Sequence, residues 1–277
     1  MKQKLTNAML IGAFAASLNV APVMGAEINN NQINKEAVFK QIENDSLSLV
    51  DGSYFYKAGF KKNGLPEIEE WYKGWTTTNV NVRKEPNTDS EVLDVLNFNK
   101  KLIFTNFNED WVKIEFSDGE AFVSKKYVSL EKCPSKKYSV PSYSGYKSWM
   151  DYQMITLAGS EQKILQDEYA YTGKYGIRQI NGRYCVAVGS HFTTRIGQYF
   201  DLILENGEVI PCILADQKAD CDTDADNIFT GHNGCATEFI VDADVLNYYA
   251  KRDGDISSCC EEWNSPVETI KIYQKTV

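Results

Sequence analysis

Short strand-like runs separated by brief turns fill the middle of the chain, and this spacing restricts the fold more than any other feature. Between Trp75 and Leu130, five such runs are separated by turns that include Pro86-Asn87-Thr88-Asp89-Ser90 and Ser117-Asp118-Gly119. Apolar residues at alternate positions are typical of strands that bury one face. Five short strands with such brief turns predict a small β-barrel.

A second β-rich part begins near residue 147. The pairs Asn181-Gly182 and Asn206-Gly207 each separate two strand-like runs, and we expect type I′ turns, in which both residues have positive φ. Thr237 to Asp242 and Val267 to Tyr273 add further strands. The sequence therefore predicts an all-β protein, in which the small barrel precedes a second barrel of six strands.

Few helices are expected in this second part. Ser160 is placed to cap a short helix that runs through Glu168, with Ile164 and Leu165 facing inward. Asp244 to Lys251 is predicted to form another short helix.

The pattern divides the chain into five segments. Residues 1–26 resemble a secretory signal peptide, because Lys2 and Lys4 precede a short apolar stretch and Gly25-Ala26 provides a cleavage point. We predict a polar segment at 27–70, the first barrel at 71–131, a linker rich in Pro, Ser and Gly at 132–146, and the second barrel at 147–277. No second apolar stretch is long enough to span a membrane, so we expect a secreted, soluble protein.

Charge and cysteine content limit the partners. The formal net charge is −9, with 38 acidic and 29 basic residues. Binding to nucleic acid depends on Lys and Arg contacts with phosphates, so nucleic acid is not an expected partner. The seven cysteines are an odd set, so at least one stays unpaired, and the pairing of the others is left open. None has the spacing of a zinc site.

The first barrel resembles a known family. Its sequence reads Thr78-Asn-Val-Asn-Val-Arg83 before Pro86, and later contains Trp111-Val-Lys-Ile114, Gly119 and Tyr127-Val128. This series is similar to the bacterial SH3 (SH3b) family over the whole segment. The resemblance implies a domain that binds cell-wall peptide or serves as a spacer and is not catalytic. We expect Trp111 and Tyr127 to pack in its core.

The second barrel carries another resemblance, centred on an apolar run, Val209 to Ala215, that ends in Asp216. With Val186-Ala-Val-Gly189 and Ile196 to Ile203, this run resembles the double-psi β-barrel. More narrowly, it resembles the three-aspartate domain of secreted Gram-positive cell-wall proteins, which shares its barrel with lytic transglycosylases and expansins. Two positions depart from that pattern. Gln217-Lys218-Ala219 replaces a Thr-Gly-Gly after the catalytic Asp, and Gly189 stands where the family has an Asp.

This resemblance implies cleavage of wall glycan in the manner of a lytic transglycosylase. Asp216 matches the general acid/base, which protonates the glycosidic oxygen before the sugar's own 6-hydroxyl closes an anhydro ring. Glu238 or Asp220 would supply a second carboxylate that raises the pKa of Asp216 by like-charge repulsion. The candidate substrate-binding residues are Tyr184, His191, Tyr199 and His232.

The alternative function is a non-catalytic protein of the cell wall, either expansin-like or structural, that binds the glycan or the stem peptide of peptidoglycan. In that case Asp216 is only the first residue of an acidic surface loop, and the aromatic side chains are part of the core. No cofactor is required under either interpretation.

Three further interpretations arise from single motifs. The alternating acids Asp220, Asp222, Asp224 and Asp226 resemble part of a calcium loop, but Ala225 replaces the glycine that an EF-hand needs, so only weak calcium binding is expected. Gly231-His232-Asn233-Gly234-Cys235 is similar to the cysteine motif of L,D-transpeptidases but lacks its upstream His. His191 follows a strand and is placed either to transfer a proton or to hydrogen-bond locally.

Overall fold

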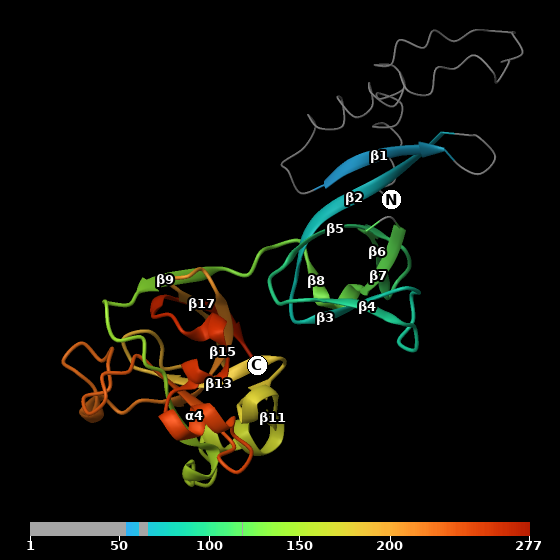
Figure 1. Ribbon diagram of the computed structural model, residues 1–277. Coiled ribbons are helices and arrows are strands. Elements are labelled where there is room, and N and C mark those ends of the chain that lie inside the picture. Colours follow the sequence, from blue (N-terminus) through green and yellow to red (C-terminus); the bar gives the residue numbers. More distant parts are fainter. Residues whose placement is uncertain (1–53, 61–65, 118) are drawn as a thin grey trace, which may run out of the picture. The chain divides into compact units, whose positions relative to one another are not determined.

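The computed structural model describes residues 54–60, 66–117 and 119–277. The predicted signal peptide and most of the segment 27–70 lie outside these residues. Ile68–Val277 belong to one compact unit, which contains most of both sheets. The described part is mostly β-structure with a few short helices (Figure 1), so the predicted fold class is confirmed. Among the described residues, no helix combines the length and apolar character needed to cross a membrane.

The first sheet has eight strands, and it contains the five strands predicted between Trp75 and Leu130. Its order is β1-β2-β5-β6-β7-β3-β4, with β8 paired to β2. The bounds are β1 (Tyr54–Phe60), β2 (Pro66–Thr76), β3 (Val80–Arg83), β4 (Val92–Leu96), β5 (Lys101–Asn106), β6 (Trp111–Phe116), β7 (Gly119–Ser124) and β8 (Val128–Ser129), with the 3₁₀ turn η1 (Lys125–Tyr127) before β8.

Alternation of side chains produces the core of the first sheet. The side chains of β5 and β6 are buried at every second position over most of their length, as expected for strands with one face turned to a core. The buried cluster consists of Val80, Val82, Leu102, Phe104, Val112, Ile114, Ala121 and Val123. Trp111 is absent from this cluster, and Tyr127 only packs against it, so the predicted core roles of these two residues are wrong in part.

The second sheet has nine strands rather than six, in the order β10-β16-β13-β15-β14-β17-β9, with β12 joined to β13 and β11 to β12. Its pairing is mixed, because β13 runs parallel to β15 and antiparallel to β16. The bounds are β9 (Ser135–Ser139), β10 (Ser148–Asp151), β11 (Tyr171–Thr172), β12 (Arg178–Ile180), β13 (Arg183–Val188), β14 (Gln198–Leu204), β15 (Val209–Gln217), β16 (Thr237–Val241) and β17 (Val267–Thr276).

Part of the predicted linker 132–146 is a strand. β9 pairs antiparallel with β17 over five register positions, from Ser135 opposite Tyr273 to Ser139 opposite Thr269. All of its side chains except the half-buried Tyr138 are exposed. An edge strand of this kind has no apolar alternation, so the sequence pattern could not reveal it.

The two Asn-Gly turns differ. Asn181 and Gly182 have φ values of 51° and 72°, as the predicted type I′ turn requires. At the second turn only Gly207 has positive φ, at 87°. The amide of Gly207 donates to the carbonyl of Leu204, which fits a longer loop built on a type I turn followed by a left-handed glycine. The prediction of a second type I′ turn is therefore wrong, although the hairpin is present.

The helices are short and capped. α3 (Glu161–Ile164) begins where predicted, because the Ser160 hydroxyl accepts a hydrogen bond from the Lys163 amide. Leu165 is buried, but Ile164 is 41% exposed, so its predicted inward orientation is wrong. α4 (Tyr248–Asp253) begins four residues later than the predicted start of its segment at Asp244, because the Asn247 side chain caps it. The remaining short turns are η2 (Tyr152–Met154), η3 (Leu165–Tyr169), η4 (Lys174–Gly176), η5 (Asp220–Asp222), η6 (Ile256–Cys259) and η7 (Glu261–Trp263).

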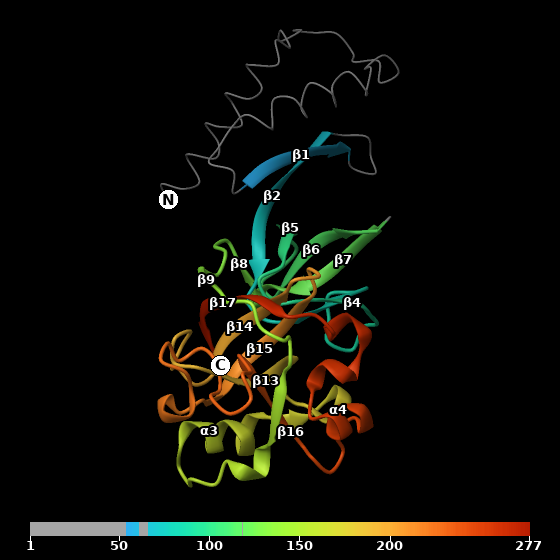
Figure 2. The same ribbon diagram turned by 60° about the vertical axis from the view of Figure 1, so that its left-hand side comes forward.

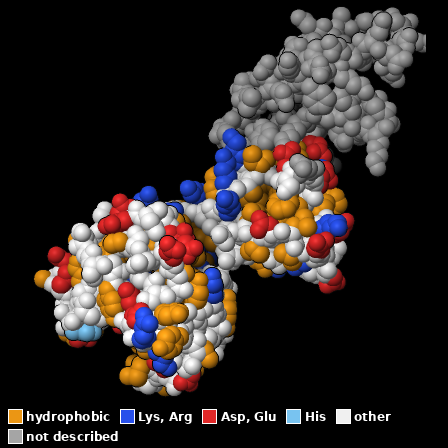
Figure 3. Space-filling view, viewed as in Figure 1, with side chains coloured by type: hydrophobic (Ala, Val, Ile, Leu, Met, Phe, Trp, Pro, Cys, Tyr) orange, Lys and Arg blue, Asp and Glu red, His pale blue; other side chains and the backbone are white. Residues whose placement is uncertain are grey.

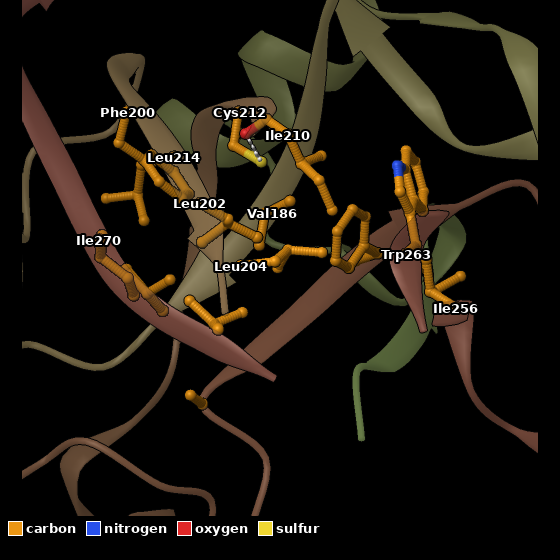
Figure 4. Close-up of a cluster of buried hydrophobic side chains, with 14 of the residues drawn as sticks. Val186, Phe200, Leu202, Leu204, Ile210, Cys212, Leu214, Ile256, Trp263 and Ile270 are labelled. Atoms are coloured by element: carbon orange, nitrogen blue, oxygen red, sulfur yellow. Dashed lines mark hydrogen bonds between the residues drawn. The ribbon is translucent and has the colours of Figure 1, made fainter. Parts of the chain in front are cut away.

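Both faces of the central strands are covered. Val186 and Val188 of β13 belong to a large apolar cluster with Phe200, Leu202 and Trp263 (Figure 4). The alternate residues of β13, Cys185 and Ala187, belong to a second cluster with Ile213, Ile240 and Tyr199. Strands buried on both faces hold their side chains rigidly, which suits a site built at their ends.

Candidate functional site

Asp216 and Glu238 lie on either side of Ala187. In the register of the sheet, Ala187 is opposite Asp216 on β15 and opposite Glu238 on β16. Residues in register on neighbouring strands project from the same face. Two strand spacings separate the two acidic residues, so their backbones lie about 10 Å apart. The structure therefore brings together the carboxylates that the sequence analysis paired.

A β-bulge decides which way Asp216 faces. Val186 is opposite Leu214, but Ala187 is opposite Asp216, so Ala215 is the extra residue on β15. In a regular ladder Asp216 would be opposite Val188, on the face filled by the large apolar cluster. The bulge turns the carboxylate to the other face instead.

The environment of Asp216 favours its protonated form. The side chain is half-buried, and desolvation raises the pKa of this carboxyl group above its ordinary value, to which the negative charge of Glu238 adds. Hydrogen bonds from the amide of Gln217, at 2.8 Å, and from the Gln162 side chain act in the opposite direction. A carboxyl group with a raised pKa is suited to donate a proton at neutral pH.

Polar side chains surround the acid pair. The Ser148 hydroxyl donates to Oε1 of Glu238 at 3.3 Å. The Lys218 ammonium is buried and donates to the Thr230 hydroxyl and, at 2.8 Å, to the carbonyl of Cys235. Burial lowers the pKa of Lys218, and the charge of Glu238 partly offsets this. Gln162 comes from α3, which Figure 2 shows at the lower end of the second sheet.

Asp220 does not join this pair. It lies exposed at the start of η5, and its carboxylate accepts a hydrogen bond from the Ser190 hydroxyl at 2.6 Å. The charge of Glu238, rather than that of Asp220, contributes to the raised pKa of Asp216. The role predicted for Asp220 as the second carboxylate therefore receives no support from its position.

The acidic loop is organised by turns rather than by a cation site. Oδ1 of Asp224 accepts hydrogen bonds from the amides of Ile228 and Phe229. Across residues 54–60, 66–117 and 119–277, no group of three or more His, Cys, Asp or Glu side chains is placed to hold a metal ion. The weak calcium binding predicted for residues 220–226 is therefore not supported by a cluster of ligands.

The four predicted substrate-binding residues do not converge on Asp216. Tyr184 packs edge-on against Trp263, with ring centroids 5.1 Å apart, on the face of β13 opposite to Ala187. Tyr199 is buried and lies opposite Ile213, about 10 Å along β15 from Asp216. His191 is exposed and contacts Tyr138 and Phe192, and His232 is exposed in the loop before Cys235. These residues therefore do not form one substrate site around the acid pair.

Cys235 is unsuited to nucleophilic catalysis. The thiol is fully buried, and desolvation raises its pKa, whereas a reactive cysteine needs a lowered one. All seven cysteines lie within the described residues, and all are unpaired. The interpretation of Cys235 as an L,D-transpeptidase nucleophile is therefore not supported.

A groove that the sequence analysis did not anticipate lies beside the first sheet. Its volume is about 740 Å³. Trp111 and Tyr127, both half-buried, form its aromatic part, and Asn181 and Tyr199 of the second sheet contribute to it. The full lining is Thr77, Thr78, Asn79, Val80, Asn81, Arg83, Thr88, Trp111, Ser124, Lys126, Tyr127, Asn181, Tyr199, Lys275, Thr276 and Val277. Asp216 and Glu238 are not among these residues.

No local pattern marks this groove in the sequence. Its residues come from separated parts of the chain, namely 77–88, 111–127, Asn181, Tyr199 and 275–277, and only the folded structure brings these together. The only signal in the sequence was that Trp111 and Tyr127 belong to the motif that carries the SH3 resemblance.

Comparison with known proteins supports the first part of the chain. Residues 78–129 match the family model described as Bacterial SH3 domain. No curated protein matches the chain, and no solved structure matches it either. The chain therefore contains a bacterial SH3 domain, in agreement with the resemblance predicted for 71–131.

Proposed function

We propose that this protein binds the bacterial cell wall, and that the groove beside its SH3 domain is the binding site. The observation that carries the proposal is the position of Trp111 and Tyr127. Both side chains belong to the matched domain and line an open groove, although Tyr127 also packs against the core cluster. Aromatic rings beside hydroxyl and amide groups are typical of sites that bind peptides or sugars.

The charge distribution agrees with this proposal better than with a nucleic-acid partner. The chain carries a net charge of −9, and acidic, basic and apolar side chains are interspersed over the face shown in Figure 3. A nucleic-acid surface requires a continuous basic patch. The proposed ligand is peptidoglycan, bound through its glycan or its stem peptide, and the proposed location is the wall of a Gram-positive cell, after export directed by residues 1–26.

Removing the Trp111 ring should weaken binding to walls. We expect the purified wild-type protein to co-sediment with isolated peptidoglycan, and Trp111→Ala to bind up to about tenfold more weakly, because a stacked aromatic ring contributes about 0.5–1.5 kcal/mol. Tyr169→Ala is the matched control, because Tyr169 is 54% exposed and lies outside the groove. Equal binding by wild type and Trp111→Ala would rule out this groove as the wall site.

A second candidate function, cleavage of wall glycan, is favoured by the acid pair. Asp216 has a raised pKa and faces Glu238 across Ala187, an arrangement suited to a general acid/base that protonates a glycosidic oxygen. Under this proposal, the second part of the chain is a double-psi β-barrel and cleaves glycan by the mechanism of lytic transglycosylases. The Gln162 side chain binds Asp216, so a glycan has to displace this part of α3 to reach the carboxyl group.

Muropeptide release tests the catalytic proposal. If Asp216 is the general acid, wild-type protein releases anhydro-muropeptides from walls, and Asp216→Asn lowers the rate at least about 100-fold. Asp226→Asn, in the exposed loop, should retain the wild-type rate. If wild type releases no muropeptides but still co-sediments with walls, the protein is a binding protein and the catalytic proposal fails.

A further inference from the structure

The groove beside the SH3 domain is lined by cations and by no acidic side chain. Arg83, Lys126 and Lys275 line it, and the side chains of the other lining residues are uncharged. This composition is unexpected in a chain whose acidic residues outnumber its basic residues by 38 to 29. A groove of one charge concentrates ligands of the opposite charge.

Two of these cations have no competing acidic partner. Within the part of the chain that the structure describes, Lys126 and Lys275 form no ion pair. The Lys126 ammonium lies 4.7 Å from the centre of the Tyr127 ring, which holds it beside the aromatic wall of the groove. Arg83 is partly engaged, because its guanidinium donates to the carbonyl of Ser90 at 2.7 Å. The two lysines are therefore the groups available to an anion.

The neutral residues of the groove favour a peptide over a phosphodiester polymer. Asn79, Asn81 and Asn181 each carry a donor and an acceptor, and the threonines of the lining carry hydroxyl groups that do both. Peptide groups offer donors and acceptors in equal number, whereas phosphodiesters only accept. The side-chain oxygen of Asn79 accepts a hydrogen bond from the backbone amide of Phe98 at 2.8 Å. The side-chain NH₂ group of Asn79 is therefore free to donate to a peptide carbonyl.

We infer that the groove selects oligopeptides with free carboxylates, which Lys126 and Lys275 bind through charge-assisted hydrogen bonds. This inference rests on the proposal that the groove is the wall-binding site, and it names the ligand as the acidic form of a stem peptide rather than its amidated form or the glycan.

Calorimetry with two matched peptides tests the inference on the full chain. The probes are acetyl-Ala-Glu-Ala-Ala with free carboxylates and acetyl-Ala-Gln-Ala-Ala amide, and oligomeric glycerol phosphate is the competing anion. We expect the acidic peptide to bind at least about tenfold more tightly than the amide, with an affinity that falls as salt is added. Lys126→Gln and Lys275→Gln should each weaken it about tenfold. Lys126→Arg should retain binding, and Lys125→Gln, next in the chain but outside the groove, should match wild type.

Three results would overturn the inference: equal affinity for the two peptides or binding of neither, insensitivity to both glutamine variants, or tighter binding of the glycerol phosphate oligomer. Walls whose carboxylates have been amidated separate this inference from the proposed function. If the protein binds amidated and native walls equally, wall binding stands and carboxylate selection fails. If it binds the acidic peptide but no walls, carboxylate selection stands and the wall-binding proposal fails.

Discussion

Asp216 faces Ala187 because β15 has one residue more than β13 at this point. Without Ala215 as the extra residue, the carboxyl group would enter the apolar cluster around Val188. An ionised carboxylate buried among apolar side chains is strongly unfavourable. The bulge instead holds the Asp216 side chain half-buried beside Glu238. Desolvation there raises the pKa of the carboxyl group, which is still partly exposed to solvent.

The raised pKa of Asp216 makes stability depend on pH in a defined direction. Its folded-state pKa exceeds the ordinary value of 3.8, so the folded chain binds the proton more tightly than the unfolded chain does. The resulting stabilisation is fully present below pH 3.8 and is lost as the pH rises through the folded-state pKa.

Asp216→Asn cannot ionise and therefore escapes that loss. The melting temperature of the variant minus that of wild type should increase from about pH 4 to about pH 7. Thermal denaturation followed by circular dichroism measures this difference, and the exposed Asp226→Asn should show a constant one. A difference that stays constant or decreases for Asp216→Asn would show that the carboxyl group is not destabilised when it ionises.

Among the elements, the end of β13 explains one departure from the three-aspartate pattern. Gly189 follows Val188, and a Cβ atom at this position would overlap the carbonyl oxygen of Asn227. The end of the acidic loop therefore crosses directly over Gly189. The aspartate that the resembling family carries at this position therefore has no room here.

Gly189→Ala should destabilise the protein by about 3 kcal/mol, because the added methyl group has to displace the backbone of the loop. Urea denaturation followed by fluorescence measures the change in the free energy of unfolding. Gly119→Ala is the matched control, since a Cβ at Gly119 meets no atom within 4 Å. If the two variants are equally stable, the loop moves aside at no measurable cost, and the close approach at Gly189 does not contribute to stability.

At the scale of the whole molecule, Phe98 joins the two sheets within one compact unit. This side chain follows β4 and packs edge-on against Tyr199 and Tyr273, with ring centroids 5.2 and 5.0 Å apart. The Arg183 guanidinium lies 5.5 Å from the centre of the Phe98 ring. Next to it, the side chain of Asn99 exchanges two hydrogen bonds with the backbone of Cys133. Tyr199 also lines the groove, so the Phe98 ring packs against one of the groove's walls.

Phe98→Ala should separate the unfolding of the two sheets. The loss of this buried ring costs about 3 kcal/mol, and the cost falls on contacts between the sheets. Wild type is expected to unfold in one calorimetric transition and the variant in two. Phe107→Ala, at a side chain that is 52% exposed, should retain a single transition. A single transition for Phe98→Ala as well would show that the other contacts suffice to couple the sheets.

The sequence by itself determined what depends on neighbours along the chain. Alternating apolar residues predicted the strands of the first sheet, the Ser160 hydroxyl predicted the start of α3, and Asn181-Gly182 predicted a type I′ turn. The pairing of Asp216 with Glu238 was reached through resemblance, and it stays a prediction, although the register of the strands places both residues opposite Ala187.

Only the tertiary structure decided what depends on residues far apart in the chain. The edge strand β9 forms because β17 is there to pair with it, and its exposed side chains leave no pattern to read. Lys147 is fully buried because four oxygen atoms, from Gly145, Ser257, Trp263 and Ser265, surround its ammonium group. The groove is lined by residues from both halves of the described chain, which lie far apart in the sequence. Local sequence specifies backbone conformation, whereas burial and the chemistry of a site depend on which distant segments the packing brings together.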